Sequence, residues 1–305
     1  MSDTTTRNTT DFGLALVEAG YLFPTGIQGV LGRSSNYAAI ANGLNALVDA
    51  WGADLGATGI QFPPVVNRAT FEETNYVQSF PDLMGAIHVF TGGNKEHAEL
   101  MRRSESGKDW SDLLEMADVF LASAACHPVY PMCTGTLPSE GKYFNVFSYC
   151  FRHEPSEDPA RMQTFQMHEI VFVGTPEEAQ EHRDAGLEVG ISILRRLGLD
   201  MDVIPANDPF FGRLGTAMAK GQQDEVLKLE GTTPIGSPDH QVAIISGNCH
   251  RDHFGSPFSI ETADGAVAHS ACVAFGVDRI TLALLWNHGL DLDRWPAEVR
   301  EALTL

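Results

Sequence analysis

Charged side chains near residue 152 have a spacing that could bind a polar ligand. Arg152 and Glu154 follow an apolar run, and Arg161 lies in the polar loop after them. Side chains two residues apart on a strand point to the same face of a sheet. A bound ligand would account for this pair of opposite charges, and a solvent-exposed ion pair would account for it as well.

Five cysteines form the second group of residues that could carry chemistry: Cys126, Cys133, Cys150, Cys249 and Cys272. None belongs to a CxxC pair, so the sequence contains no zinc-ribbon or dithiol redox motif. Free cysteines are commonly small core residues. Two interpretations stay open, namely buried structural thiols or a metal site assembled from distant parts of the chain.

An antiparallel hairpin over residues 147–173 must position the charged group. Two apolar, strand-like runs flank a polar loop there, which predicts a hairpin with an unusually long loop. Upstream, apolar residues at spacings of three and four predict a helix over residues 37–51. The run GIQFPPVV then predicts a strand at a sheet edge or a subunit contact, because prolines are confined to strand edges and bulges.

The remaining elements complete an α+β pattern. A run of strands with one long helix inserted predicts a mostly antiparallel sheet flanked by helices. Residues 1–10 are predicted to be disordered and residues 11–305 to form a single domain. The other predicted elements are helices over residues 96–104, 110–118, 175–199 and 278–289, a short hairpin over residues 21–32, and a hairpin that turns at Asp264 and Gly265.

The composition excludes several classes of protein. Forty acidic residues against twenty basic ones give a net charge of −20, which makes the chain a poor general binder of nucleic acid. No apolar run approaches the roughly 20 residues that span a bilayer, and the N-terminus lacks the pattern of a secretory signal. We therefore expect a cytoplasmic protein. Neither a GxGxxG nor a Walker A loop is present.

Three short motifs resemble those of the class II aminoacyl-tRNA synthetases. FRHE at residues 151–154 resembles motif 2, and GVDRI at residues 276–280, which opens an apolar helix, resembles motif 3. The strand that ends in Pro63 and Pro64 resembles motif 1. They occur in the family's order, and the resemblance covers roughly residues 37–290. It implies a class II synthetase catalytic core.

The resemblance implies an ATP site and a role for each residue in it. Arg152 would hold the α-phosphate and Arg279 the γ-phosphate, so these two would be the catalytic residues. Arg161 would reach the terminal phosphates, Glu154 would contact the adenine amino group, and Phe165 would stack on the adenine ring. Such cations suit the charge of a triphosphate, which would bring Mg²⁺ with it. A core role for Phe165 and a helix-capping role for Arg279 are the simpler alternatives.

A subgroup within this family is indicated by two further patterns. Arg161, Phe165 and Glu169 match the R-x-x-x-F-x-x-x-E pattern of the seryl-tRNA synthetases, and SGNCHRDHF resembles their S-C-S-N-C-x-D-F. The likeness is greatest to the atypical, zinc-dependent branch, which implies Zn²⁺ bound by Cys126, Glu169 and Cys272 with a fourth position open for the amino acid. Cys133 is the alternative first ligand.

Departures from that branch point to truncated relatives. The core begins almost at the N-terminus, without the tRNA-binding arm of seryl enzymes. A glutamate that usually helps bind magnesium is missing from the strand before SGNC, and Gln241 or Asp239 could stand near its place. This combination resembles the amino acid:[carrier protein] ligases. It implies activation of a small amino acid, glycine or alanine, and its transfer to the phosphopantetheine thiol of a carrier protein.

Two other functions remain as alternatives, a seryl-type tRNA-charging enzyme and a catalytically silent paralogue that acts as a binding protein. The surplus of acidic residues argues against the first, and the presence of all the motif residues argues against the second. Motif 1 strands pair across a two-fold axis in this class, which implies a homodimer. For a carrier protein, which is usually acidic, the candidate basic residues are Arg102, Arg103, Lys108, Arg195 and Arg196.

Overall fold

A seven-stranded sheet forms the centre of the protein. The computed structural model describes residues 2–212, 220 and 225–305. In spatial order the strands are β10 (Asp202–Ala206), β11 (Lys228–Pro234), β12 (Gln241–Arg251), β14 (His269–Gly276), β9 (Thr164–Gly174), β8 (Lys142–Phe151) and β3 (Thr58–Gln61). All neighbours are antiparallel except β3 and β8. The predicted α+β fold is confirmed, and β3 lies at an edge as expected.

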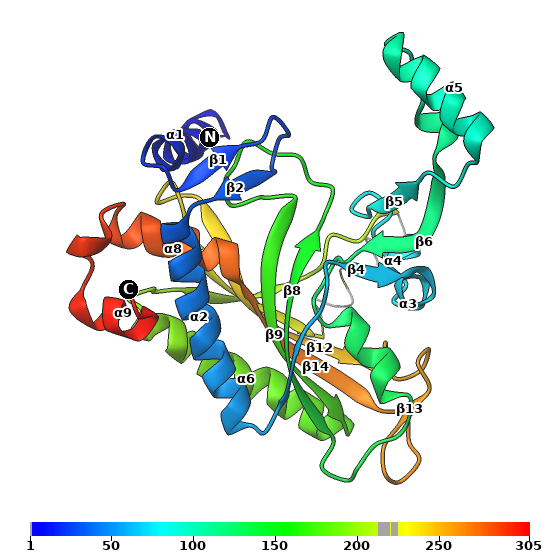
Figure 1. Cartoon of the computed structure of the whole chain (residues 1–305). Coiled ribbons are helices and arrows are strands. Elements are labelled where there is room, and N and C mark those ends of the chain that lie inside the picture. Colours follow the sequence, from blue (N-terminus) through cyan, green and yellow to red (C-terminus); the bar gives the residue numbers. More distant parts are fainter. Residues whose placement is uncertain (1, 213–219, 221–224) are drawn as a thin grey trace.

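Helices cover one face of this sheet (Figure 1). Helix α6 (Pro176–Arg196) lies across β12 and β14, and α2 (Ser35–Asp54) lies against β8 and β9. At Gly190 an added Cβ would come within 2.5 Å of the Ile245 side chain, so α6 approaches the sheet closely. Helices α8 (Val277–His288) and α9 (Ala297–Leu303) pack beside α2. These helices do not cover the opposite face of the sheet, where the site described below lies.

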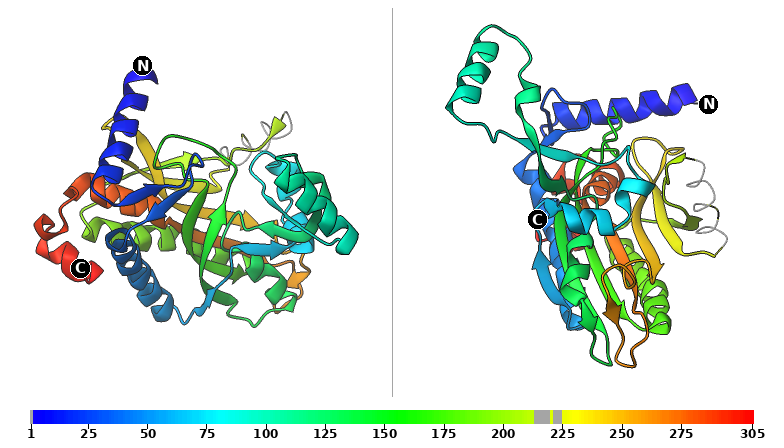
Figure 2. Two further views of the ribbon diagram at one scale, coloured as in Figure 1. Left: turned by 45° about the horizontal axis from the view of Figure 1, so that its top comes forward. Right: turned by 90° about the vertical axis from the view of Figure 1, so that its right-hand side faces the viewer.

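A smaller three-stranded sheet follows β3 in the chain. Its order is β4 (Val65–Asn67), β6 (Glu115–Leu121) and β5 (Ala86–Val89), and α3 (Arg68–Glu73) and α4 (Tyr76–Ser79) follow β4 in the chain. Helix α5 (Asn94–Glu105) projects away from the rest of the molecule (Figure 2) and has no buried residue. The predicted helix over residues 110–118 is wrong. A 3₁₀ turn, Ser111–Leu113, and strand β6 replace it, because pairing with β4 and β5 outweighs local propensity.

The described N-terminal segment begins with a helix, and disorder over residues 1–10 stays a prediction. Helix α1 runs over Ser2–Glu18, and its apolar residues Phe12 and Leu16, four positions apart, are buried in the main core. Such a spacing places both side chains on one helical face, which anchors the second half of the helix on the core. The following hairpin, β1 (Leu22–Pro24) with β2 (Leu31–Arg33), is confirmed. A single domain over residues 11–305 stays a prediction.

Short elements complete the described part of the chain. These are 3₁₀ turns at His127–Cys133 and Leu292–Arg294, and strands β7 (Gly135–Thr136) and β13 (Ile260–Glu261). None of the helices in the described ranges combines the length and the apolar character needed to cross a membrane. A Gly-containing segment of the sequence, residues 210–221, lies largely outside the described residues.

The predicted central hairpin is confirmed. Strands β8 and β9 pair up to Phe151 and Thr164, which leaves residues 152–163 as the long loop. The N–H of Arg152 donates to the carbonyl of Gln163 at 2.9 Å, and the N–H of Gln163 donates to the carbonyl of Gly29 at 2.7 Å. Gly29 has a φ of 73°, and a Cβ there would lie 3.2 Å from the Gln163 side chain. The N-terminal hairpin therefore holds the loop in place.

Candidate active site

The strand alternation gathers polar side chains on the face of the sheet away from α6. Paired residues on neighbouring strands form a row across β11, β12, β14 and β9, namely Glu230, Ser246, Ala274 and Glu169. Residues two apart on each strand share this face. Lys228, Asn248 and Cys272 form the adjacent row for the same reason. Two neighbouring cavities open over these rows.

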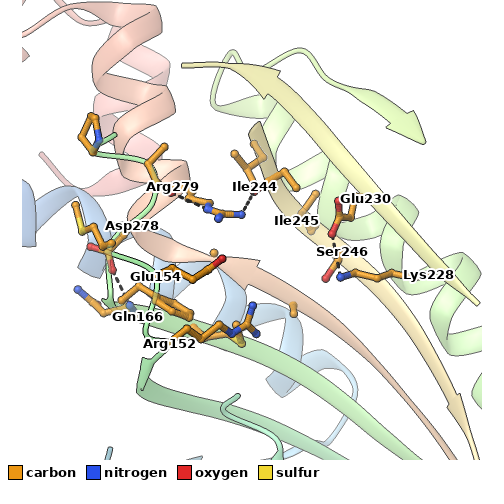
Figure 3. A pocket seen from close by; sticks show the side chains of 18 residues that line it. Arg152, Glu154, Gln166, Lys228, Glu230, Ile244, Ile245, Ser246, Asp278 and Arg279 are labelled. Carbon is orange, nitrogen blue, oxygen red and sulfur yellow. Dashed lines mark hydrogen bonds and ion pairs between the residues drawn. The ribbon is translucent and has the colours of Figure 1, made fainter. Parts of the chain in front are cut away.

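The first cavity, which we call the arginine cavity, lies over the ends of β9, β11 and β14 beside the hairpin loop. Its lining includes Arg152, Glu154, Phe165, Lys228 and Arg279. Figure 3 shows the charged ends of the four charged residues among them projecting into one space from the hairpin loop, from β11 and from the start of α8. Four of the five residues predicted to bind ATP are thus brought together.

Arg279 is fixed by two backbone carbonyls. Its Nε donates to Ala160 in the hairpin loop at 2.9 Å, and one terminal nitrogen donates to Ala243 on β12 at 3.0 Å. Burial lowers the pKa of Arg279, and the positive charges of Arg152 and Arg161 lower it further. Three guanidinium groups therefore repel one another here, which is the arrangement expected of a site for a highly charged anion.

Arg152 lies between the loop and the second cavity. Its Nε donates to the carbonyl of Ser123 at 3.2 Å, and its guanidinium lies 5.5 Å from the centre of the Phe165 ring. A cation over an aromatic face is attracted by the ring quadrupole. Phe165 is partly exposed and lines the arginine cavity as well as packing on the core, so a ring-stacking role and a core role are both compatible with its position.

Arg161 does not line the arginine cavity in the described structure. Its side chain is 55% exposed and contacts Glu154 at 3.3 Å. An exposed ion pair of this kind contributes little stability. The loop residue is therefore close enough to influence Arg279 electrostatically but is held by one weak contact.

A buried carboxylate in the lining of the arginine cavity, Asp278, was missed by the sequence interpretation. Asp278, 2% exposed, accepts hydrogen bonds from Arg33 at 2.6 Å, from the Tyr37 hydroxyl at 2.9 Å and from the N–H of Gln166 at 2.6 Å. These bonds join β2, α2 and β9 to the first turn of α8. Because Arg33 and Asp278 are 245 positions apart, spacing alone gave no signal for them.

The second cavity, which we call the thiol cavity, contains all three residues predicted to bind zinc. Cys126, Glu169 and Cys272 line it and are 4%, 1% and 2% exposed. Glu169 accepts hydrogen bonds from the N–H groups of Ala125 at 2.9 Å and Cys126 at 3.2 Å. Burial raises the pKa of Glu169, whereas hydrogen bonds from the two thiols and the two N–H groups act to lower it. The three side chains therefore interact directly.

The donor chemistry of this trio suits zinc, but its arrangement does not by itself define a metal site. Two thiols and a carboxylate are ligands that Zn²⁺ takes in proteins. Within the described ranges, no group of three or more His, Cys, Asp or Glu side chains is placed so that it could hold a metal ion. Cys272 also contacts Asn248 at 3.4 Å and His250 at 3.6 Å.

Other residues weighed from the sequence fall into two groups. Cys133 and Cys150 are buried in the cluster beneath the thiol cavity, whereas Cys249 lines that cavity itself. Of the two residues weighed as magnesium ligands, Gln241 begins β12 and Asp239 lies in the turn before it. In the described part of the chain, the carboxylate that faces the arginine cavity from this side is Glu230.

Solved structures identify the class of fold. The chain matches seryl-tRNA synthetase of Methanopyrus kandleri, solved with tRNASec of A. aeolicus, with a TM-score of 0.82 and 22% identity over 96% of this chain and 60% of that one. It matches the Pyrococcus horikoshii enzyme complexed with ATP with a TM-score of 0.71 and 15% identity, over 96% and 62% of the two chains. The fold is that of a class II aminoacyl-tRNA synthetase core.

Sequence relatives identify the family. Amino acid–[acyl-carrier-protein] ligase 1 of Bradyrhizobium diazoefficiens is 41% identical over 282 residues, which cover 92% of this chain and 86% of the relative; ligase 2 of that organism is 39% identical. The type-2 serine–tRNA ligase of Methanopyrus kandleri is 25% identical, and the match spans 51% of its length. No family model matches. The chain belongs to the amino acid–[acyl-carrier-protein] ligase family and is an enzyme.

Proposed function

We propose that this enzyme activates glycine or alanine with ATP and transfers the aminoacyl group to the phosphopantetheine thiol of a carrier protein. The observation that carries the proposal is the shared wall of the two cavities. Arg152, Met167, Lys228, Ser246 and Ala274 line both of them. A nucleotide in the arginine cavity and an amino acid in the thiol cavity would meet at this wall.

The proposed first step joins the amino acid to the α-phosphate of ATP. A carboxylate oxygen attacks the α-phosphorus, the bond to the β-phosphate breaks, and pyrophosphate leaves with the electron pair. Arg152 at the shared wall would hold the α-phosphate, while Arg279 and Arg161 would hold the terminal phosphates. Glu154 would contact adenine and Phe165 would stack on it. Magnesium would enter with ATP, as it does in most phosphoryl-transfer sites.

The proposed second step releases AMP. The carrier thiol attacks the carbonyl carbon of the adenylate, a thioester bond forms, the acyl–phosphate bond breaks, and the thiol proton passes to solvent. The thiol cavity has a volume of about 470 Å³. This is more than a glycine or alanine fills, and the remainder could admit the end of a thiol arm.

Zinc binding by Cys126, Glu169 and Cys272 is part of the proposal. Its support is the convergence of the three side chains in one buried cavity next to Arg152. Small rearrangements of these side chains would be needed, since they now hydrogen-bond to each other. A zinc ion held there would supply an open coordination position for the amino group of the substrate.

The basic residues considered as a docking surface for the carrier protein lie in separate places. Arg102 and Arg103 on α5 are paired with Glu99, and Arg103 also with Asp112, so much of their charge is neutralised. Arg195 and Arg196 end α6, which lies far from α5 in Figures 1 and 2. The five candidate basic residues therefore do not form one patch.

A homodimer and a cytoplasmic location complete the proposal. The exposed edge strand β3 is available for pairing with a second copy. All five cysteines are free thiols, which suits a reducing compartment.

Amino-acid-dependent pyrophosphate exchange, followed by transfer to a phosphopantetheinylated carrier protein or to bulk tRNA, tests the proposed function. We expect exchange that is strongest with glycine or alanine and a thioester on the carrier. Strong charging of tRNA would instead favour the seryl-type alternative, and absence of exchange with all twenty amino acids would leave only a binding role.

A further inference from the structure

The shared wall of the two cavities carries two positive charges. Arg152 is one of them, and Lys228 on β11 is the other. In Figure 3 the ammonium of Lys228 projects from β11 into the space that the Arg152 guanidinium enters from the hairpin. Lys228 is opposite Asn248 in the strand register, and Asn248 contacts Cys272. The lysine therefore faces the amino-acid side as well as the nucleotide side.

The fold holds Lys228 in a defined position. Its side chain is only 13% exposed, and its Nζ lies 2.6 Å from Asp208 and 3.0 Å from Glu230. Burial acts to lower the pKa of Lys228, but the two carboxylates outweigh it and raise the pKa above its usual value. The ammonium is therefore charged at neutral pH. Two of its three N–H groups are engaged by these carboxylates, and an ammonium has a third to donate.

From this geometry we infer that Lys228 is a catalytic residue of adenylate formation and acts with Arg152 on the reacting α-phosphate. The inference rests on the proposed function. When the carboxylate oxygen bonds to the α-phosphorus and the bond to pyrophosphate breaks, negative charge increases on the non-bridging oxygens between the two cavities. A fixed ammonium donor at the wall stabilises that charge, and no proton or electron is transferred.

A purely structural ion pair would be the simpler role for Lys228. Such a role requires only that the ammonium neutralise Asp208 and Glu230. It predicts that the double variant K228M/E230Q, which removes one positive and one negative charge together, is tolerated. The catalytic role predicts the opposite, because the double change still removes the donor from the α-phosphate. The variants K228M and K228M/E230Q separate these roles.

The test measures pyrophosphate exchange with glycine and with alanine in wild type, K228M, K228R and K228M/E230Q. R294M, which breaks an exposed ion pair with Asp291, is the control. We expect K228M and the double variant to lower kcat by about 100-fold or more, with the KM for ATP changed by less than about threefold. We expect K228R to retain within about tenfold of wild-type kcat and R294M to match wild type.

Each outcome decides the inference. If K228M folds poorly, the double variant, in which the partner carboxylate is also neutralised, gives the answer. Recovery of wild-type kcat in K228M/E230Q, or a K228M enzyme within threefold of wild type, would overturn the role of Lys228 and leave the proposed function standing. Absence of exchange in the wild-type enzyme would overturn the proposed function and this inference with it.

Discussion

Arg279 and Arg161 both belong to the motifs that resemble an ATP site, yet the fold holds them differently. Arg279 bridges the hairpin loop and β12 through two carbonyls, and Arg161 makes one exposed contact. A preorganised cation stabilises developing charge far better than one that must first be ordered. The two arginines should therefore contribute unequally to activity.

Exchange of each arginine for glutamine tests this difference. We expect R279Q to lower kcat/KM for ATP in pyrophosphate exchange by about 100-fold or more, because the donor and its position are both lost. R161Q should lower it by less than about tenfold, since the side chain is exposed and screened. Equal losses in the two variants would show that the loop arginine is ordered when ATP binds and would contradict this ranking.

Zinc binding is a separate prediction for the residues of the thiol cavity. Elemental analysis of the purified protein should find about one zinc ion per chain, and C272S and E169Q should each lose it. C133S, a change at the alternative ligand position, should keep the metal. Thermal unfolding checks that the variants are folded. A metal-free preparation with full exchange activity, or loss of metal in C133S alone, would contradict the assignment of Cys126, Glu169 and Cys272.

Three elements meet at a buried polar cluster centred on His168 of β9. The imidazole contacts Asn45 of α2 at 2.9 Å and Asn145 of β8 at 2.5 Å, and it lies 3.5 Å from Asp49. Burial lowers the pKa of His168 to about 4, although Asp49 acts to raise it. His168 is thus neutral in the folded protein at neutral pH, and the cluster ties α2 to the hairpin.

The depressed pKa predicts loss of stability in acid. As pH falls from about 6.5 to 4, the unfolded chain binds a proton at this histidine before the folded one does, so unfolding is favoured; above 6.5 the stability is fully present. The effect is on the order of 3 kcal/mol. Urea unfolding at pH 7 and pH 4.5 should show a clearly smaller drop in H168Q than in wild type. Equal drops in both proteins would mean that His168 does not contribute.

The sequence predicted those elements in which apolar residues recur at regular spacing within the element itself. The hairpin, α2 and α6 came from such patterns. Arg152 and Glu154 do line one cavity, but both lie in the loop after β8 and not on a strand, so strand parity is not the reason. The first part of β6, residues 115–118, was predicted as a helix because the pairing partners of this strand are remote in sequence.

The site residues that the sequence did not indicate were missed for the same reason, because their partners are remote in sequence. Lys228 and Glu230 show the two-residue spacing of opposite charges that drew attention to Arg152 and Glu154. Only the register of β11 against β12, with Glu230 opposite Ser246, places them at the shared wall. Asp278 needed the distant Arg33 for its role to be visible. The spacing along a strand predicts which face of the sheet a side chain lies on. The order and register of the strands decide which residues of other strands lie next to it.

At the scale of the whole molecule, the distribution of charge matters more than its sum. The net charge of −20 disfavours binding of polyanions in general. Three arginines nevertheless converge near one cavity. The cations Arg152, Lys228 and Arg279 line this cavity together with carboxylates, so a small anion meets fixed local donors, while the surplus of acidic residues repels large polyanions. Selection of ATP and rejection of RNA are therefore compatible in one acidic protein.

The exposed edge of the main sheet carries the last prediction, a homodimer formed through β3. Gly59 lies on this strand, and an added Cβ there would have no atom within 4 Å. The variant G59R should therefore be tolerated by one copy but should obstruct a second copy paired along the strand. Light scattering at micromolar concentration should give twice the chain mass for wild type and the single-chain mass for G59R. V203R, on exposed strand β10 at the opposite edge, should stay dimeric, and a monomeric wild type or a dimeric G59R would contradict pairing at β3.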